Sequence, residues 1–172
     1  MLYSELQCSD AIHKAVERMG FAEMTEIQEK TIPVMMAGYD VIAKAPTGTG
    51  KTCAFGIPVA EHILPENKYP QAVIMAPTRE LAQQIAQELE ELTYFMPEVQ
   101  VACVYGGANM EKQARRLAEG CQIVVATPGR LMDHYKHHSI DLAHVTQVVL
   151  DEADEMLNMG FYKDVRHIIE LM

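Results

Sequence analysis

The sequence predicts an α/β fold with a mostly parallel β-sheet that has helices on both faces. Two observations carry this prediction. Short runs rich in Val and Ile alternate with helical patterns along most of the 172 residues, as parallel strands joined by crossover helices do. Glycine-rich and charged segments directly follow several of these runs. They should therefore lie at the carboxyl edge of the sheet, where ligands bind in such folds.

The first 36 residues predict two helices. Residues 10–19 carry their apolar side chains on one helical face, and Gly20 ends the pattern. Residues 25–36 open with Thr25, followed three positions later by Gln28, which is the pattern of a capping box. We expect residues 1–36 to form a helical N-terminal part packed on the core, and residues 37–172 to form the main α/β domain.

Strands and helices alternate over the rest of the chain. The apolar runs predict strands at residues 41–43, 72–76, 99–104, 123–126 and 145–150. Helical patterns predict helices that end near residue 64, that cover residues 80–94 and 110–118, and that begin near residue 130. An amphipathic pattern is still running at Met172, so we expect the chain to be part of a longer protein.

The composition is that of a globular protein, because 49% of the residues are apolar and 22% are charged. No apolar run approaches the ~18 residues that cross a bilayer, and the N-terminus lacks the pattern of a secretion signal. We therefore expect no membrane partner. The formal net charge of −10 argues against nucleic-acid binding, since nucleic-acid-binding proteins are usually basic. Such binding is compatible with this charge only if the surface is small, local and built largely from backbone groups.

The cysteines and histidines do not stand at the spacing of a metal centre. The four cysteines form no Cys-x-x-Cys pair, which favours reduced thiols and a cytoplasmic location. Four histidines lie close together in the sequence, at His134, His137, His138 and His144. No cysteine or carboxylate stands at ligand spacing from them, so we expect a polar helix end and loop there, with a zinc site as the alternative.

The strongest functional signal is a glycine-rich segment between a predicted strand and a predicted helix. It reads Ala45-Pro46-Thr47-Gly48-Thr49-Gly50-Lys51-Thr52. Glycines let the backbone wrap around phosphates, and the helix N-terminus that follows favours negative charge, so this context predicts a phosphate-binding loop. We expect Lys51 to reach the β- and γ-phosphates and the Thr52 hydroxyl to bind Mg²⁺. Ala45 stands where the general pattern has glycine, and an ordinary strand-to-helix turn is the alternative.

An acidic cluster at residues 151–155 directly follows the last predicted strand. A phosphate loop requires a second Mg²⁺ anchor. Asp151 is the candidate, acting through water because Mg²⁺ tends to keep its hydration shell. Glu152 is the candidate to orient or deprotonate the attacking water. The alternative is a helix N-terminus whose acidic residues favour the macrodipole, and this alternative also accounts for Asp154 and Glu155.

Together, the phosphate loop and the Asp-Glu-Ala-Asp sequence at residues 151–154 resemble the DEAD-box RNA helicase family. This resemblance implies a RecA-like P-loop NTPase fold that uses ATP and Mg²⁺. It also implies that Lys51, Asp151 and Glu152 carry catalysis, and that Asp154 couples the domains.

Residues 20–28 resemble the Q motif of the same family. The resemblance implies that Phe21, Thr25 and Gln28 belong to the nucleotide site and that Gln28 reads the adenine edge. The family's aromatic residue that stacks on adenine corresponds to Tyr3, where phenylalanine is usual. Met24 stands where the family usually has proline, which changes local stiffness.

Three further segments resemble the family's RNA-contacting motifs. The first is Pro77-Thr78-Arg79, followed by Glu-Leu-Ala; the second is Gly106-Gly107; the third is Thr127-Pro128-Gly129-Arg130. The resemblance implies that Arg79 and Arg130 pair with RNA phosphates. The donors of hydroxyl or backbone N–H groups would be Thr78, Gly107, Thr127 and Gly129. Such contacts hold a strand by its backbone and read no base sequence. Taken alone, each segment is also compatible with a capped turn.

The resemblance covers only the first of the family's two RecA-like domains. It implies a parent protein in which ATP and RNA close a clamp between this domain and a second RecA-like domain, so that ATP use drives RNA unwinding or RNP remodelling. Arginines that complete the γ-phosphate site belong to the second domain, and an arginine finger contributes ~10³–10⁵ in rate. We therefore expect little activity from this chain alone. The alternatives are a P-loop ATPase acting on DNA or protein, and a non-catalytic nucleotide-binding module.

Overall fold

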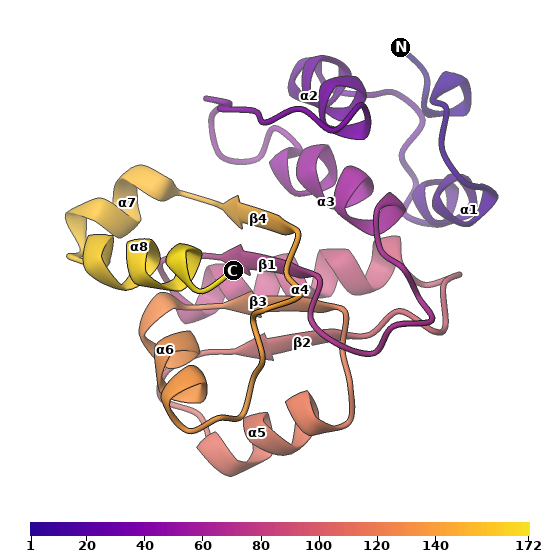
Figure 1. The fold of residues 1–172 in the computed structure, drawn as a ribbon. Coiled ribbons are helices and arrows are strands. Elements are labelled where there is room, and N and C mark those ends of the chain that lie inside the picture. Colours follow the sequence, from indigo (N-terminus) through magenta and orange to yellow (C-terminus); the bar gives the residue numbers. More distant parts are fainter. The chain divides into compact units, whose positions relative to one another are not determined.

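The computed structural model describes all 172 residues, which form two compact units. The N-terminal unit comprises Met1–Ile63 and Glu88–Pro97, and the sheet unit comprises Leu64–Gln87 and Glu98–Met172. Figure 1 shows the elements of each unit. The expected division of the chain between residues 36 and 37 stays a prediction.

Helices make up the N-terminal unit. Its elements are η1 (Tyr3–Glu5), α1 (Asp10–Arg18), α2 (Glu26–Met36), α3 (Lys51–Glu61) and the end of α4 (Arg79–Leu92). The two helices predicted before residue 37 are confirmed, and each begins at a capping side chain. Ser9 caps α1 by accepting a hydrogen bond from the amide of Ile12, and Thr25 forms a capping box with Gln28 at the start of α2.

The helices of the N-terminal unit pack through their apolar faces. α1 buries Ile12, Ala15 and Val16, and α2 packs against α3. Gly56 on α3 lies so close to the end of α4 that an added Cβ would be 2.9 Å from Leu92. A larger residue at position 56 would therefore require the side chains of Leu92 and Leu89 to shift.

The strand predicted at residues 41–43 is absent. Residues 39–46 form neither helix nor strand, and Ile42 is fully exposed. A strand is stabilised by hydrogen bonds to a neighbouring strand, and the sheet of this structure has no strand from this segment. The apolar run has the residue types that favour a strand, but it forms no strand because no neighbouring strand pairs with it.

The sheet unit is built on four short parallel strands, which are β1 (Ala72–Met75), β2 (Val101–Val104), β3 (Ile123–Ala126) and β4 (Gln147–Leu150). Their order in the sheet is β2-β3-β1-β4. The predicted α/β fold with a mostly parallel sheet is confirmed, with four strands instead of the five expected. β1 and β3 lie in the middle and are completely buried, whereas Val148 and Leu150 on the edge strand β4 are partly exposed.

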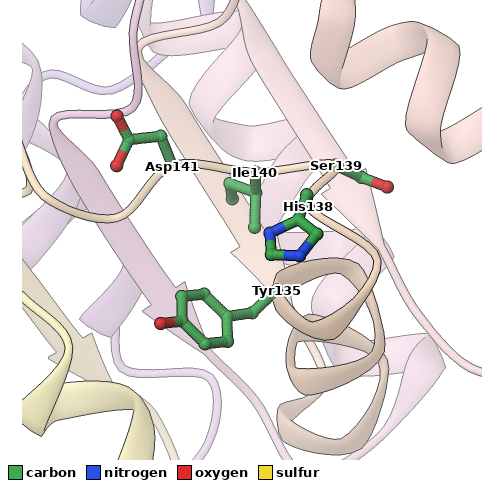
Figure 2. A pocket seen from close by; sticks show the side chains of 5 residues that line it. All are labelled: Tyr135, His138, Ser139, Ile140 and Asp141. Atoms are coloured by element: carbon green, nitrogen blue, oxygen red, sulfur yellow. The ribbon is translucent and has the colours of Figure 1, made fainter.

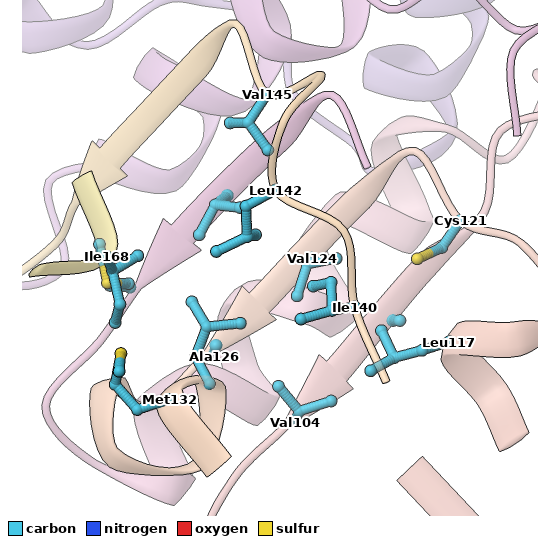
Figure 3. Packing of buried hydrophobic residues seen from close by; sticks show 14 of the residues in the cluster. Val104, Leu117, Cys121, Val124, Ala126, Met132, Ile140, Leu142, Val145 and Ile168 are labelled. Carbon is cyan, nitrogen blue, oxygen red and sulfur yellow. The ribbon is translucent and has the colours of Figure 1, made fainter. Parts of the chain in front are cut away.

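Apolar side chains from alternate strand positions form the core of the sheet unit. Val73 and Met75 of β1, with their counterparts in β2 and β3, point to one face. The helices of this unit are the first part of α4, α5 (Met110–Ala118), α6 (Pro128–Lys136), α7 (Ala153–Asn158) and α8 (Tyr162–Glu170). Figure 3 shows Met132 of α6 and Ile168 of α8 in this cluster, together with Leu142 from the loop before β4.

The strands end in register. Met75 pairs with Ala126 and with Leu150, and Ala126 pairs with Val104. Because all four strands run parallel, the segments that follow them meet at one edge of the sheet. We call this edge the rim, and it consists of residues 76–79, 105–109, 127–130 and 151–154.

Candidate nucleotide site and rim

The predicted phosphate loop is a tight turn that leads into α3. Gly48 and Gly50 both have a φ of +81°, a left-handed conformation that glycine adopts freely and that costs other residues about 1–2 kcal/mol. The Thr49 hydroxyl closes the turn by donating a hydrogen bond to Pro46 O at 2.6 Å. The loop therefore has the backbone shape that wrapping around an anion requires.

Gly50 is the N-cap of α3, so Lys51 and Thr52 occupy the first turn of this helix. The amide of Ala54 is the first in α3 to donate back along the chain, to Gly50 O at 3.2 Å. The amides that precede Ala54 in α3 make no such bond back along the helix, and they point toward its N-terminal end. Together with the helix dipole they form a site that favours phosphate.

Gln28 connects the residue 20–28 segment to the phosphate loop. Its side chain is only 3% exposed. Its Oε1 accepts hydrogen bonds from the amide of Thr25 at 2.9 Å and from the hydroxyl of Tyr3 at 2.5 Å, and its Nε2 donates to Gly50 O at 3.1 Å. A Cβ on Gly50 would overlap Gln28 Nε2, so this approach requires glycine. Gln28 thus completes a capping box and also holds the loop.

Tyr3 lies inside the N-terminal unit, with 5% of its surface exposed. Its ring stacks on Phe21, with 6.4 Å between centroids and 23° between ring planes. Burial raises the pKa of the Tyr3 phenol above its ordinary value of 10, so the hydroxyl stays protonated and donates to Gln28. The more exposed ring is that of Phe21. Stacking of Tyr3 on adenine stays a prediction, and Phe21 is the ring that presents an apolar face to solvent.

The first two predicted RNA-contacting segments come together at the rim. The Thr78 hydroxyl caps α4 by accepting from the amide of Leu81 at 3.2 Å. The guanidinium carbon of Arg79 lies 4.9 Å from the centroid of the Tyr105 ring, in a cation–π arrangement. A Cβ on Gly107 would lie 3.7 Å from Arg79 Nη1. Arg79 and the Gly-Gly turn are therefore neighbours, as the shared strand edge predicts.

The third segment begins α6, with Thr127 as its N-cap and Pro128 in the first turn. Arg130 Nη1 donates to Ala108 O at 3.0 Å and to Gln113 Oε1 at 3.1 Å, and Arg130 Nε lies 3.8 Å from Asp133 Oδ2. The two hydrogen bonds use Nη1, the contact of Nε with Asp133 is a longer ion pair, and Nη2 is left for another acceptor. Arg130 is therefore partly a structural brace, and any phosphate contact that it makes goes through the remaining donor.

Two buried polar residues beside the rim belong to none of the predicted motifs. Gln113 is 8% exposed and His134 is completely buried, and His134 Nε2 lies 3.0 Å from Gln113 Oε1. Gln113 precedes Leu117 by one helical turn on the buried face of α5. In the sequence, Gln113 could have been identified as a polar residue at an apolar position of an amphipathic helix.

The acidic segment follows β4 at the rim. The amide of Asp151 donates to Met75 O at 3.0 Å, and the amide of Glu152 donates to Asp151 Oδ1 at 3.0 Å. Glu152 has a φ of 54°, which is uncommon for a residue other than glycine. Non-glycine residues in this region concentrate at functional sites. Asp154 is exposed in the first turn of α7, where its carboxylate accepts from the amide of Glu155 at 3.0 Å.

The Thr52 hydroxyl and the Asp151 carboxylate are each oxygen donors of a kind suited to Mg²⁺, and their binding to one ion stays a prediction. No group of three or more His, Cys, Asp or Glu side chains is placed to hold a metal ion. The histidines have other contacts. His137 Nδ1 lies 2.7 Å from Asp133 O, and the ring of His144 stacks on Tyr69.

A pocket of about 320 Å³ lies beside the end of α6. Figure 2 shows the side chains that line it, and they are Tyr135, His138, Ser139, Ile140 and Asp141. None of them belongs to the predicted nucleotide or RNA sites. None of the helices combines the length and the apolar character needed to cross a membrane.

Comparisons with known proteins agree with this geometry. A family profile described as DEAD/DEAH box helicase matches residues 25–172. An "ATP-dependent RNA helicase CshA" of Limosilactobacillus reuteri is 51% identical over 170 residues, which is 99% of this chain and 34% of the relative. A "DEAD-box ATP-dependent RNA helicase CshA" of Geobacillus kaustophilus is 49% identical over 97% of this chain and 36% of the relative. The chain thus spans about a third of the length of these curated relatives.

Solved structures show the same fold. The crystal structure of a DEAD box protein from Methanococcus jannaschii has a TM-score of 0.91 and 42% identity, and the match covers 99% of this chain and 47% of the other. A hypothetical ATP-dependent RNA helicase from Sulfolobus tokodaii has a TM-score of 0.87 and 40% identity, over 95% of this chain and 47% of the other. Because the profile match covers most of the residues and the fold agrees, this chain belongs to the DEAD/DEAH box helicase family.

Proposed function

We propose that this chain is the ATP-binding domain of an ATP-dependent RNA helicase, which couples ATP binding and hydrolysis to local unwinding of RNA duplexes or remodelling of RNPs. The observation that carries the proposal is the phosphate loop. Gly50 caps α3 in a left-handed conformation directly before Lys51, and Gln28 of the Q-motif segment bonds to Gly50 O. Family membership supplies the context in which this loop binds ATP.

The residues around the loop fit a nucleoside triphosphate. The turn at Gly48 and Gly50 and the N-terminal amides of α3 suit the phosphates, and Lys51 in the first helical turn supplies positive charge to the β- and γ-phosphates. On the adenine side, Gln28 offers an amide held in a fixed orientation by its bonds to Thr25 and Tyr3. Phe21 offers an apolar ring face.

The residues that would hold Mg²⁺ are Thr52, through its hydroxyl, and Asp151, through a water molecule. The chemistry of both oxygens fits a hard cation. When bound, Mg²⁺ would neutralise negative charge on the phosphates, which makes it easier for water to attack the γ-phosphate. Glu152 orients this water or removes its proton, and its left-handed backbone conformation supports an active-site role.

RNA binds along the rim through its sugar-phosphate backbone in this proposal. Arg79 is exposed there, Arg130 keeps one free terminal nitrogen, and the turns at Gly107 and Gly129 offer amides. Because these few donors are local, they are compatible with the net charge of −10. Backbone contacts specify no bases, so the choice of RNA depends on other parts of the parent protein.

A second RecA-like domain of the parent completes the ATP site, and ATP and RNA together favour the closed state of the two domains. The energetic basis is that both ligands bind the closed state more tightly than the open one. Asp154, in the first turn of α7, carries the coupling between the domains. We place the parent protein in the cytoplasm, because none of the four cysteines of this chain forms a disulfide.

The test is ATP hydrolysis by the full-length parent with RNA, with DNA and without nucleic acid. We expect RNA, and not DNA, to stimulate hydrolysis. Lys51→Ala or Glu152→Gln should lower kcat about 100-fold or more. Lys163→Ala and Glu90→Gln, which change exposed residues of α8 and α4, are matched controls and should leave the rate unchanged. Stimulation by DNA, or the same rate without nucleic acid, would identify a different kind of P-loop ATPase. Activity that survives both site substitutions would indicate a non-catalytic nucleotide module.

A further inference from the structure

Gln113 makes hydrogen bonds to three different parts of the rim region. Its Nε2 donates to Tyr105 O at 3.0 Å. Its Oε1 accepts from Arg130 Nη1 at 3.1 Å and lies 3.0 Å from His134 Nε2. All four residues belong to the sheet unit. None of the recognised family motifs contains Gln113.

The chemistry of the partners determines the orientation of the Gln113 amide. A backbone carbonyl accepts only, so the NH₂ group must face Tyr105, and a guanidinium donates only, so Oε1 must face Arg130. His134 must then carry its proton on Nε2. Its other ring nitrogen, Nδ1, is buried without a hydrogen-bond partner, and burial lowers the pKa of the ring, so the imidazole is neutral with Nδ1 unprotonated. This set of bonds therefore has a single consistent arrangement.

These bonds hold the Gly106-Gly107 turn on both sides. Gln113 bonds to the carbonyl of Tyr105, directly before the two glycines, and Arg130 bonds to the carbonyl of Ala108, directly after them. The turn contains Gly107 at a φ of +83°. Glycine adopts positive and negative φ about equally well, so Gly107 by itself does not select this conformation. The conformation of the turn is thus selected by Gln113 and by the arginine that Gln113 orients.

We propose that Gln113 is a positioning residue for RNA backbone binding. It orients the guanidinium of Arg130 so that Nη2 faces a phosphate, and it fixes the Gly106-Gly107 turn so that its amides present donors beside Arg130. This inference rests on the proposed function, because it assumes that the rim binds RNA. Its benefit is preorganisation, since groups that are already ordered lose less conformational freedom when RNA binds.

The test uses the full-length parent protein, a single-stranded RNA and a non-hydrolysable ATP analogue. Gln113→Met keeps the length of the side chain and removes all three hydrogen bonds. RNA affinity should fall roughly twofold to tenfold, the effect of losing the net contribution of one hydrogen bond. Gln87→Met is the matched control, because Gln87 is an exposed glutamine of α4. It should bind RNA as the wild type does.

The salt dependence of RNA binding separates positioning from a general loss of structure. For a single strand, the slope of log K against log salt is negative, and removing one phosphate contact lowers its magnitude by ~0.7. Arg130→Ala and Gln113→Met should each lower the magnitude of the slope by about this amount, and the double variant should lower it no further. A partly unfolded variant would bind less RNA at an unchanged slope. Nucleotide affinity without RNA should stay at the wild-type value.

Gln113→Glu is the second variant, and it keeps the test decisive if Gln113→Met does not fold. Its carboxylate still accepts from Arg130 and His134 but no longer donates to Tyr105 O, so the wild-type salt slope should be retained. A slope as shallow as that of Arg130→Ala would overturn the positioning role. A wild-type slope and affinity in Gln113→Met would also overturn it. Failure of the wild type to bind RNA would instead contradict the proposed function itself.

Discussion

The phosphate loop is shaped by its backbone, whereas the rim of the sheet unit is shaped by side chains. In the loop, two glycines with positive φ and the start of α3 shape the predicted anion site, and the side chains of Gln28 and Thr49 support it. At the rim, the Gly106-Gly107 turn is held by Gln113 and Arg130. The difference matters because backbone and side-chain sites fail in different ways. A backbone site is damaged by an added Cβ, and a side-chain site by the removal of a partner.

Gly50→Ala should have the largest effect on stability, because two costs add. Its φ is +81° and its Cβ would overlap Gln28 Nε2, whereas Gly48 has the same φ and open space around it. We expect Gly48→Ala to cost about 1–2 kcal/mol from backbone strain. Gly50→Ala should cost about 2–3 kcal/mol, since the Gln28 bond is lost as well. Urea unfolding of this chain measures the difference. Equal costs would show that Gln28 does not depend on the glycine.

Tyr3→Phe tests the support of the loop by removing the hydroxyl that donates to Gln28. We expect a loss of about 0.5–1.5 kcal/mol in the free energy of unfolding. Tyr39→Phe is the control, because Tyr39 is an exposed tyrosine of the same unit. Unchanged stability with a weaker affinity for adenine nucleotides would contradict this expectation and would favour direct contact between Tyr3 and the base.

Acid should weaken the rim region through His134. Burial, and next the charge of Arg130, lower the pKa of His134 below its ordinary value of 6.5. The unfolded chain therefore takes up this proton at a higher pH than the folded chain. The stabilising effect of the neutral ring is complete above pH 6.5 and is lost as the pH falls through the lower folded-state pKa.

Urea unfolding between pH 8 and pH 5 compares the wild type with His134→Gln, in which an amide takes the place of the ring and does not titrate. The wild type should lose more stability on acidification than the variant. His167→Gln, at an exposed position of α8, should behave as the wild type does. Parallel pH profiles for the wild type and His134→Gln would show that His134 does not contribute.

Thiol labelling gives the smallest effect and compares the two units directly. Each unit contains one buried cysteine, Cys53 in the N-terminal unit and Cys121 in the sheet unit. Burial raises the pKa of Cys53 to about 12 and that of Cys121 to about 11, so little thiolate forms at neutral pH. We expect both to react with a thiol reagent only when their unit opens, after the partly exposed Cys8 and Cys103.

The order in which Cys53 and Cys121 react shows which unit opens first. Mass spectrometry of the labelled chain assigns each modification. Cys121→Ala serves as the control, because it should leave the early labelling of Cys8 and Cys103 unchanged. Immediate modification of Cys53 or Cys121 in the native chain would contradict the burial of these two thiols.

Much of the local structure was predictable from short-range patterns. The capping box of Thr25 and Gln28, the turn before Lys51 and the alternation of apolar runs with helices all depend on residues within a few positions of each other. The expected strand at residues 41–43 was wrong for a related reason. Its local preference is that of a strand, but the structure provides it with no neighbouring strand.

The sequence by itself determined the fold class, the family and the segments that we predict to form the site, because these depend on composition, periodicity and motif spacing. Tertiary structure alone decided the strand order β2-β3-β1-β4, the bond from Gln28 to Gly50 and the place of Gln113 between Tyr105, Arg130 and His134. These features join residues far apart in the chain. A polar side chain such as Gln113 is stable in the interior only where its partners converge, and that convergence exists only in the folded protein.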